Sequence, residues 1–317
     1  MRPKKKAPAE AEHRSGFVSI LGRPNTGKST LLNALVGTKL AIVADKPQTT
    51  RTTIQGVWTT AGAQAVFMDT PGIHSGERRL NRRMMESIRE ALDHRDLLLY
   101  VIDAAREPGE EDERALDLLK QAATPALAVF NKIDLVKDKR KLLPLISRYR
   151  ELHGFEDFIP ISARKEMGLE TLRKAIIERL PKGPAYFPPD QLTDQPERFL
   201  LAEIVREKIL AATREEVPHS TAVTIEEWKE EGRLTRVSAT SHVERPGQKA
   251  IILGEKGGRL KAIGTEARLE CERLLGKRFY LGLFVRVTKD WRENEEFLRE
   301  LDWRAMSGGS AREPEGA

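Results

Sequence analysis

Residues 22–29, with the sequence GRPNTGKS, constrain the fold of this chain more than any other segment. They fit the pattern G-x-x-x-x-G-K-S/T and lie between a short β-type run at 17–21 and a helical pattern at 30–35. A strand, a glycine loop and a helix in that order predict backbone N–H groups that face phosphates at the start of the helix. A chance glycine-rich turn would lack these flanks, so the sequence predicts a phosphate-binding loop.

Individual residues of this loop have separate expected roles. Lys28 should reach the β- and γ-phosphates of a nucleotide, and the Ser29 hydroxyl should hold Mg²⁺. The nucleotide contacts predicted in the loop are Gly22, Asn25, Thr26, Gly27, Lys28, Ser29 and Thr30.

A second motif, NKID at 131–134, follows the apolar run at 126–130, which is typical of a buried parallel strand. A carboxylate can accept hydrogen bonds from both the N1–H and the 2-amino group of guanine, and adenine offers neither donor there. Asp134 therefore predicts GTP rather than ATP, which disfavours a helicase-type ATPase. A short loop after the run at 158–161 is expected to pack over the base. The predicted nucleoside contacts are Asn131, Lys132, Asp134, Ser162 and Ala163.

A third motif, DTPG at 69–72, follows the apolar run at 65–68. Asp69 should hold Mg²⁺ through water, and the Gly72 N–H should contact the γ-phosphate. The same tetrapeptide is common in ordinary turns. Its position between the phosphate loop and the guanine motif favours the functional interpretation.

The polar stretch at 44–53 lies between the first and third motifs and is suited to a switch loop that orders on nucleotide binding. Thr50 is the preferred Mg²⁺ ligand, with Thr49 as the alternative, and a solvated polar loop is the other interpretation. The predicted metal ligands are Ser29, Thr50 and Asp69. The predicted catalytic residues are Lys28, Thr50 and Gly72.

Strand and helix patterns alternate through residues 16–180. This alternation predicts an α/β P-loop NTPase domain with a mostly parallel sheet, helices on both faces and nucleotide loops at the carboxyl ends of the strands. The proline-rich segment 181–196 predicts a semi-rigid linker. The expected strands are 17–21, 64–68, 97–103, 126–130 and 158–161, and the expected helices are 28–36, 80–92, 110–121, 138–152 and 168–179.

A second module spans residues 197–303 and has a different order of elements. The order is a helix, two strands, two helices and a strand, and GEKG at 254–257 stands between the two adjacent helices. This resembles an α+β type II KH domain, in which glycines let an RNA backbone approach closely. The expected elements are helix 197–213, strands 221–225 and 234–238, helix 249–253, a helix ending at 275 and strand 279–287.

Positive charge concentrates around this Gly-x-x-Gly clamp. Residues 245–289 contain eleven Lys or Arg and four Asp or Glu, whereas 197–317 contains twenty-two of each sign. Cations beside a backbone clamp predict binding to single-stranded RNA through its phosphates. The predicted RNA contacts are Gly254, Glu255, Lys256, Gly257, Arg259 and Lys261.

Taken together, the motifs closely resemble the Era family of bacterial GTPases, over roughly residues 15–303. The resemblance implies a GTPase that switches between GTP and GDP with Mg²⁺. It implies binding near the 3′ end of 16S ribosomal RNA and a role in assembly of the 30S ribosomal subunit. It also implies peripheral association with the inner face of the cell membrane. The segments that carry it are 22–33, 48–51, 69–74, 131–134 and 254–257.

One position departs from Ras-like GTPases, because Ile73 stands where those proteins place a glutamine that orients the attacking water. Isoleucine cannot hydrogen-bond that water, so we expect slow intrinsic hydrolysis. GTPases that resemble this chain and carry Asn at the position of Asn25 can hold K⁺ near the phosphates. We therefore expect K⁺ to accelerate GTP hydrolysis through Asn25. The alternative is that Asn25 only caps the turn of the phosphate loop.

The two domains are expected to communicate. GTP should order both switch loops and change the angle between the domains across 181–196, so that the GTP form binds RNA more tightly. A membrane-associated signalling switch with secondary RNA binding is the main alternative function. An RNA-modifying enzyme is disfavoured, because the sequence shows no cysteine nucleophile or second cofactor motif.

Composition sets further bounds. A chain of 317 residues can form two cores, and 39% hydrophobic with 32% charged residues is typical of a globular protein. No apolar run approaches the roughly 20 residues that span a bilayer. The single Cys271 allows no internal disulfide and fits a reducing cytoplasm. We expect a monomer with a disordered basic tail at 1–15 and a disordered tail at 304–317.

Three further segments have structural interpretations. His74 is expected to be a solvated loop residue, the acidic run at 226–231 a hairpin turn, and 291–303 a terminal helix whose aromatic side chains pack on the KH core.

Overall fold

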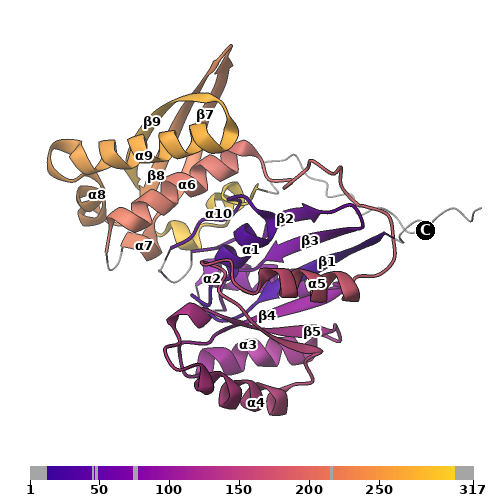
Figure 1. Ribbon diagram of the computed structural model, residues 1–317. Coiled ribbons are helices and arrows are strands. Elements are labelled where there is room, and N and C mark those ends of the chain that lie inside the picture. The colour runs from indigo at the N-terminus through magenta and orange to yellow at the C-terminus, as the bar shows by residue number, and fades with distance from the viewer. Residues whose placement is uncertain (1–12, 45, 47–48, 74–77, 215–216, 304–317) are drawn as a thin grey trace, which may run out of the picture.

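The computed structural model describes residues 13–303 except 45, 47–48, 74–77 and 215–216, and it contains two sheets (Figure 1). The first sheet has six strands in the order β2-β3-β1-β4-β5-β6. Its neighbours pair in parallel except β2 and β3, which are antiparallel. This confirms the predicted mostly parallel sheet. The strands are β1 (Arg14–Leu21), β2 (Ile54–Thr59), β3 (Ala63–Asp69), β4 (Leu97–Asp103), β5 (Ala126–Asn131) and β6 (Asp157–Pro160).

Helices cover both faces of this sheet, as predicted. One hydrophobic core joins α1 (Lys28–Val36) and α5 (Leu169–Arg179) to the sheet. Another core, on the other face, joins α2 (Arg79–Leu92), α3 (Glu110–Gln121) and α4 (Leu142–Leu152).

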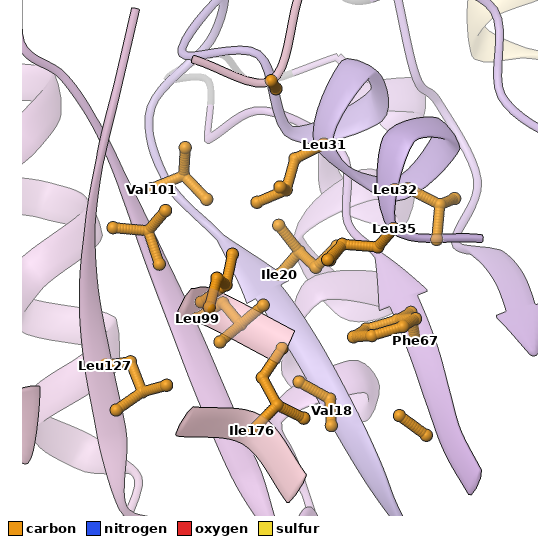
Figure 2. Close-up of a cluster of buried hydrophobic side chains, with 14 of the residues drawn as sticks. Val18, Ile20, Leu31, Leu32, Leu35, Phe67, Leu99, Val101, Leu127 and Ile176 are labelled. Atoms are coloured by element: carbon orange, nitrogen blue, oxygen red, sulfur yellow. The ribbon is translucent and has the colours of Figure 1, made fainter. Parts of the chain in front are cut away.

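Figure 2 shows the first of these cores, where α1 packs on β1. Leu31, Leu32 and Leu35 of the helix meet Val18 and Ile20 of the strand, and all five side chains are fully buried. Burying one such side chain contributes about 1.5–3 kcal/mol. Because both flanks are anchored in this way, the loop between β1 and α1 is held in a fixed shape.

The edge strand β2 was not predicted. It carries polar and small residues among its apolar ones, and Gly56 lies so close to α1 that an added Cβ would stand 2.9 Å from Leu32 and Val36. Such a strand has neither a continuous apolar run nor clean alternation, so its sequence gives no strand signal. The helix predicted at 138–152 begins as a 3₁₀ turn, Lys139–Lys141, and continues as α4.

The second sheet has the order β7-β8-β9, with β7 and β8 antiparallel and β8 and β9 parallel. Buried side chains of α6 and α9 pack against it in a separate core. The order of elements confirms the predicted type II KH fold. The elements are α6 (Glu197–Ala212), α7 (Val217–Ser220), β7 (Ala222–Glu231), β8 (Leu234–Val243), α8 (Pro246–Leu253), α9 (Gly258–Leu275) and β9 (Arg278–Val287).

The acidic run at 226–231 was wrongly predicted as a hairpin turn. These residues belong to β7, and the chain reverses at Gly232, whose φ of 61° favours glycine. This end of the edge strand β7 is exposed at every position except the half-buried Trp228, so it tolerates a run of charges that resembles a loop.

The terminal segment also differs from its prediction. It forms a 3₁₀ turn, Trp291–Glu293, and a short helix, α10 (Glu295–Glu300), rather than one helix. Trp291 and Leu298 pack with Leu80 and Met84 of α2, and Trp303 donates a hydrogen bond of 3.0 Å to the Thr53 carbonyl. These side chains therefore join the two domains instead of filling the KH core, a choice that amphipathic spacing does not reveal.

The linker 181–196 lies along the edge of the first sheet. The backbone N–H groups of Tyr186 and Phe187 donate to Gln64 Oε1 at 2.7 and 2.9 Å, and Val57 N–H donates to the Leu192 carbonyl at 2.8 Å. These bonds tie the linker to the GTPase-like domain along much of its length.

Some predictions concern residues outside the described part of the chain. The tails expected at 1–15 and 304–317 lie there almost entirely, except that β1 already begins at Arg14. His74 also lies outside the described residues. Among the helices that are described, none is both long and apolar enough to cross a membrane.

Candidate functional site

The phosphate loop joins β1 to α1, and two glycines allow its close packing. Gly22 has a φ of 157°, and a Cβ there would stand 2.4 Å from the Val101 carbonyl oxygen. Gly27 has a φ of 93°, and its Cβ would stand 2.4 Å from Asn131 Nδ2. Side chains are therefore excluded at both positions, and their absence lets the loop pack closely against β4 and Asn131.

Lys28 begins α1 and points back into the loop. Its Nζ donates to the carbonyls of Gly22 and Arg23, at 3.0 Å each. Burial lowers the pKa of Lys28 to about 8, against the opposing effect of Asp69. A buried ammonium at this place is suited to neutralise phosphate oxygens.

The three predicted metal ligands converge on one point. Ser29 Oγ lies 2.8 Å from Thr50 Oγ1 and 2.7 Å from Asp69 Oδ2, and Thr50 Oγ1 lies 3.2 Å from the same carboxylate oxygen. Thr49 instead donates its hydroxyl to the carbonyl of Lys46 at 2.6 Å. The geometry thus favours Thr50 over the alternative Thr49.

Asp69 has a feature that fits a cation. Burial raises its pKa to about 6, although Lys28 and the hydroxyls of Ser29 and Thr50 act in the opposite direction. Its Oδ1 is buried and has no hydrogen-bond partner among the described residues. An unsatisfied buried carboxylate oxygen beside two hydroxyls is a hard oxygen set that suits Mg²⁺.

The loop after β3 places Gly72 and Ile73 on different sides. Gly72 lies against Pro24 of the phosphate loop, where a Cβ would stand 3.0 Å from the proline Cα. Ile73 is 5% exposed and packs in the core under α2. Gly72 thus reaches the phosphate side, while Ile73 turns away from it.

The guanine motif is held by Asn131. Its Nδ2 donates to the Thr26 carbonyl at 2.9 Å, and its Oδ1 accepts from the backbone N–H groups of Lys132 and Ala163 at 2.8 and 2.9 Å. This one side chain joins the phosphate loop, the guanine motif and the loop after β6.

Asp134 is exposed, so its carboxylate can receive a base. Ser162 Oγ donates to Asp134 Oδ1 at 2.6 Å, which fixes the orientation of the carboxylate. Together with Ala163, these residues form the nucleoside side of the candidate site.

A buried charge network beneath the site was missed from the sequence. Arg23 Nε lies 3.0 Å from Asp112 Oδ2 on α3, and Arg23 also approaches Asp103 at the end of β4, at 3.9 Å. Lys132 Nζ donates to Asp103 at 2.8 Å and to the Asn25 carbonyl. The network therefore links the phosphate loop to the guanine motif. Its members lie up to about a hundred residues apart, so spacing gives no sign of it.

The Gly-x-x-Gly clamp lies between α8 and α9. Gly254 has a φ of 68°, and a Cβ there would meet Arg259 at 2.7 Å; Gly257 has a φ of 79° and is the N-cap residue of α9. Lys256 also takes a left-handed φ, of 49°. The positive end of the α9 dipole and the side chains of Lys256 and Lys261 are thus available to a phosphate backbone.

A groove runs beside the clamp, between α9 and β9. Gly257 and Lys261 of its lining were predicted RNA contacts, whereas the other lining residues read in the sequence only as helix and strand positions. They are Gly257, Leu260, Lys261, Gly264, Thr265, Arg268, Leu281 and Leu283. The groove has an apolar floor and a cationic rim, which suits unstacked bases with phosphates at the edge.

The KH domain also contacts the loop that includes switch I through ion pairs and hydrogen bonds, and no sequence signal predicted this contact. This contact involves the loop of residues 39–53, which includes switch I and is called loop 39–53 below. Lys39 Nζ lies 2.5 Å from Glu207 Oε2 on α6 and pairs with Glu270 on α9, and Val43 N–H donates to Glu207 Oε1 at 2.8 Å. Although burial favours its neutral form, hydrogen bonds from Lys208 and Lys39 hold the pKa of Glu270 below its ordinary value.

Two arginines complete this contact. Arg206 of α6 donates to the Thr49 carbonyl and pairs with Glu203. Arg51 donates to the Thr221 carbonyl at 2.7 Å and lies over the Trp291 ring at 5.4 Å. We call these contacts, together with those of Lys39 and Val43, the switch clasp.

The fold and the site define a class: a P-loop GTPase with an appended KH domain. A family model for 50S ribosome-binding GTPases matches residues 17–132, and a KH-domain model matches residues 216–292. GTPase Era of Geobacter metallireducens is 49% identical over 92% of this chain and 98% of its own length. That of Heliobacterium modesticaldum is 48% identical over 91% and 96%. The chain belongs to the Era family of GTPases.

Solved structures agree over most of the chain. An Aquifex aeolicus Era variant bound to GDP and AlF₄⁻ superposes with a TM-score of 0.88 at 41% identity and covers 92% of this chain and 99% of its own. An Era structure in complex with MgGDPNP and nucleotides 1506–1542 of 16S ribosomal RNA gives 0.89, with the same identity and coverage. The predicted family, fold class and GTPase activity are thereby confirmed.

Proposed function

We propose that this GTPase binds the 3′-terminal region of 16S ribosomal RNA through its KH domain and acts in assembly of the 30S subunit as a cytoplasmic monomer. Its nucleotide state is read by the KH domain through the switch clasp. The observation that supports this coupling is the course of α9. The helix begins at the Gly-x-x-Gly clamp, at Gly258, and it carries Glu270, which pairs with Lys39 of loop 39–53.

On the nucleotide side, the geometry supports the following roles. Ser29, Thr50 and Asp69 are the residues that would hold Mg²⁺, which supplies charge neutralisation for the phosphates when bound. Lys28 and Gly72 line the nucleotide pocket, where Lys28 would neutralise the β- and γ-phosphates and the Gly72 N–H would contact the γ-phosphate. Asp134 distinguishes guanine from adenine.

The attacking water needs a partner other than Ile73, which is buried. Asn25 lines the nucleotide pocket and takes a φ of 61°, with its carbonyl held by Lys132. We therefore propose that K⁺, held near the Asn25 side chain, supplies positive charge that an arginine finger supplies in other GTPases.

On the RNA side, support comes from the clamp geometry, the cationic rim of the groove and the RNA complex of an Era relative. The relevant test measures affinity for a 16S 3′-terminal RNA in the wild type and in Gly254→Asp with Gly257→Asp. We expect the double variant to lose specific binding while GDP affinity is unchanged. RNA affinity equal to that of the wild type would overturn the proposal.

Coupling is proposed to pass through the clasp. GTP changes the environment of Thr50, and the neighbouring Thr49 carbonyl is bonded to Arg206 of α6. The linker 181–196 is hydrogen-bonded to the first sheet, so we do not assign the change of angle between the two domains to the linker alone. Peripheral association with the inner face of the membrane would be a further property, with the cationic N-terminal residues as its proposed contact.

A further inference from the structure

One face of the KH sheet is only partly covered by helices, since α10 packs Phe297 on His242 at one end of it. Tyr280 and Phe284 project from β9 on this face and are 57% and 59% exposed. Arg236 of β8 lies over the Tyr280 ring at 5.2 Å, whereas no aromatic or cationic partner of the Phe284 ring is found among the described residues. Single exposed apolar side chains are common on protein surfaces, so the groups around the Phe284 ring decide whether it marks a binding surface.

Phe284 lies in a hollow with a mixed lining. Ser238 and Thr240 come from β8, Lys249 from α8, Arg286 from β9 and Glu226 from β7. Within the described part of the chain, Lys249 and Arg286 form no salt bridge, unlike Arg236 on the same face, which pairs with Glu231. Two cations that form no salt bridge within the described residues therefore flank one exposed ring, although Glu226 lines the same hollow and the charge of Arg286 also acts on Glu300.

This combination matches one nucleotide of a single strand. A base stacks on an exposed aromatic ring, cations neutralise the adjacent phosphates, and hydroxyls and a carboxylate meet the polar edges of the sugar or base. A membrane-inserting face would present several apolar side chains without such a polar floor. Single-stranded RNA is therefore the occupant that the charges favour.

The hollow also lies within reach of the clamp. Lys249 precedes Gly254 by five residues on α8, which corresponds to about 7 Å along a helix axis. The strand β9 is one of the two edge strands of its sheet, with the groove residues Leu281 and Leu283 on one face and Phe284 on the other. An RNA held in the groove can pass around this edge without crossing another element of the sheet.

We propose that RNA leaving the Gly-x-x-Gly clamp passes around the free edge of β9 and stacks one base on Phe284, with Lys249 and Arg286 neutralising the neighbouring phosphates. This inference rests on the proposed RNA binding through the clamp. It adds a second contact region, on the opposite face of the sheet.

The test uses the full-length protein and a series of single-stranded RNAs from the 3′ end of 16S ribosomal RNA, truncated stepwise from either end to four nucleotides. Affinity is measured by fluorescence anisotropy for the wild type and Phe284→Ala. For the longer RNAs we expect Phe284→Ala to weaken binding by about fivefold to a hundredfold, the range for losing one stacked base. The shortest RNAs that still bind the clamp should bind both proteins equally.

Tyr280→Ala is the matched control, because Tyr280 is equally exposed on the same strand face but lies outside the hollow. It should leave the affinity for every RNA unchanged, and Phe284→Trp should restore the binding of long RNAs. Equal affinity of Phe284→Ala and wild type for the long RNAs would overturn the inference while leaving clamp binding intact. Failure of the wild type to bind any RNA would overturn the proposed function instead. Loss of binding to anionic phospholipid vesicles in Phe284→Ala, with RNA affinity unaltered, would reassign the face to a membrane and also overturn the inference.

Discussion

The ion pair between Arg23 and Asp112 provides a stringent test of how the phosphate loop is held. In the wild type, the Gly109 N–H donates to Asp112 Oδ2 at 3.1 Å. Asp112→Asn keeps an oxygen that can accept this hydrogen bond but removes the negative charge that faces Arg23. The side chains of Arg23 and Asp112 are 9% and 8% exposed, and the remaining acidic partner of Arg23, Asp103, lies at 3.9 Å. Arg23 therefore becomes a buried cation with weak compensation.

The expected cost follows from that burial. Removing one partner of a buried pair costs about 3–5 kcal/mol, and retention of a neutral hydrogen bond reduces this to about 2–3 kcal/mol. For a GTPase domain of this size the melting temperature should fall by about 5–10 °C. Affinity for GDP should fall too, because Lys28 Nζ is bonded to the Arg23 carbonyl. Thermal melting and isothermal titration calorimetry measure the two effects.

Two controls separate the pair from helix α3 as a whole. Asp117→Asn changes an exposed carboxylate on the same helix and should alter stability by less than about 0.5 kcal/mol. Adding Arg23→Met to Asp112→Asn should recover part of the loss, since no unpaired buried charge remains. If Asp112→Asn melts at the same temperature as Asp117→Asn, the reasoning is refuted.

Three further predictions concern the base, the cation and acid stability. Asp134→Asn removes charged acceptors for the guanine N1–H and 2-amino groups and should weaken GTP binding by about a hundredfold with little change in melting temperature, whereas an unchanged Kd would exclude the assigned role. Turnover of GTP should be faster in K⁺ than in Na⁺ at equal ionic strength, and Asn25→Ala should abolish the difference; equal rates in the wild type would dismiss the K⁺ proposal. Burial, with a smaller effect of Arg286, lowers the pKa of His242 to about 4, so the native ring stays neutral while the unfolded one gains a proton below about pH 6.5. Stability should therefore decline from about pH 6.5 toward pH 4, by up to about 3 kcal/mol, and His242→Gln should flatten that decline in urea titrations. The charged groups that face this ring are Arg286 on β9 and Glu226 on β7.

Local patterns in the sequence predict the elements that position the nucleotide. The phosphate loop and the guanine motif are each contained within a short stretch, because consecutive residues make the contacts, and each KH element has its own local pattern. The bounds of β4, α1 and α3 agree with their predicted ranges for the same reason. The strand β2 escapes prediction because it is an edge strand whose pairing with β3, rather than its own pattern, makes it a strand.

The contacts between distant segments could not be predicted in this way. Arg23 and Asp112 meet only because the sheet brings β1 beside β4 and α3 packs beneath them. The pairing of Lys39 with Glu207 depends on how two domains dock, and each residue alone reads as a solvated charge. Trp291 was correctly expected to be buried, but which domain covers it is a property of tertiary structure.

The central claim is that the KH domain reads the nucleotide through the switch clasp. The most direct measurement is the Kd for a 16S 3′-terminal RNA with GDP and with a non-hydrolysable GTP analogue, in the wild type, in Glu207→Gln with Glu270→Gln, and in the exposed α9 control Glu266→Gln. We expect wild type and control to bind RNA at least fivefold more tightly with the GTP analogue, and the clasp variant to show a ratio near one. A clasp variant that keeps the wild-type ratio would contradict the claim.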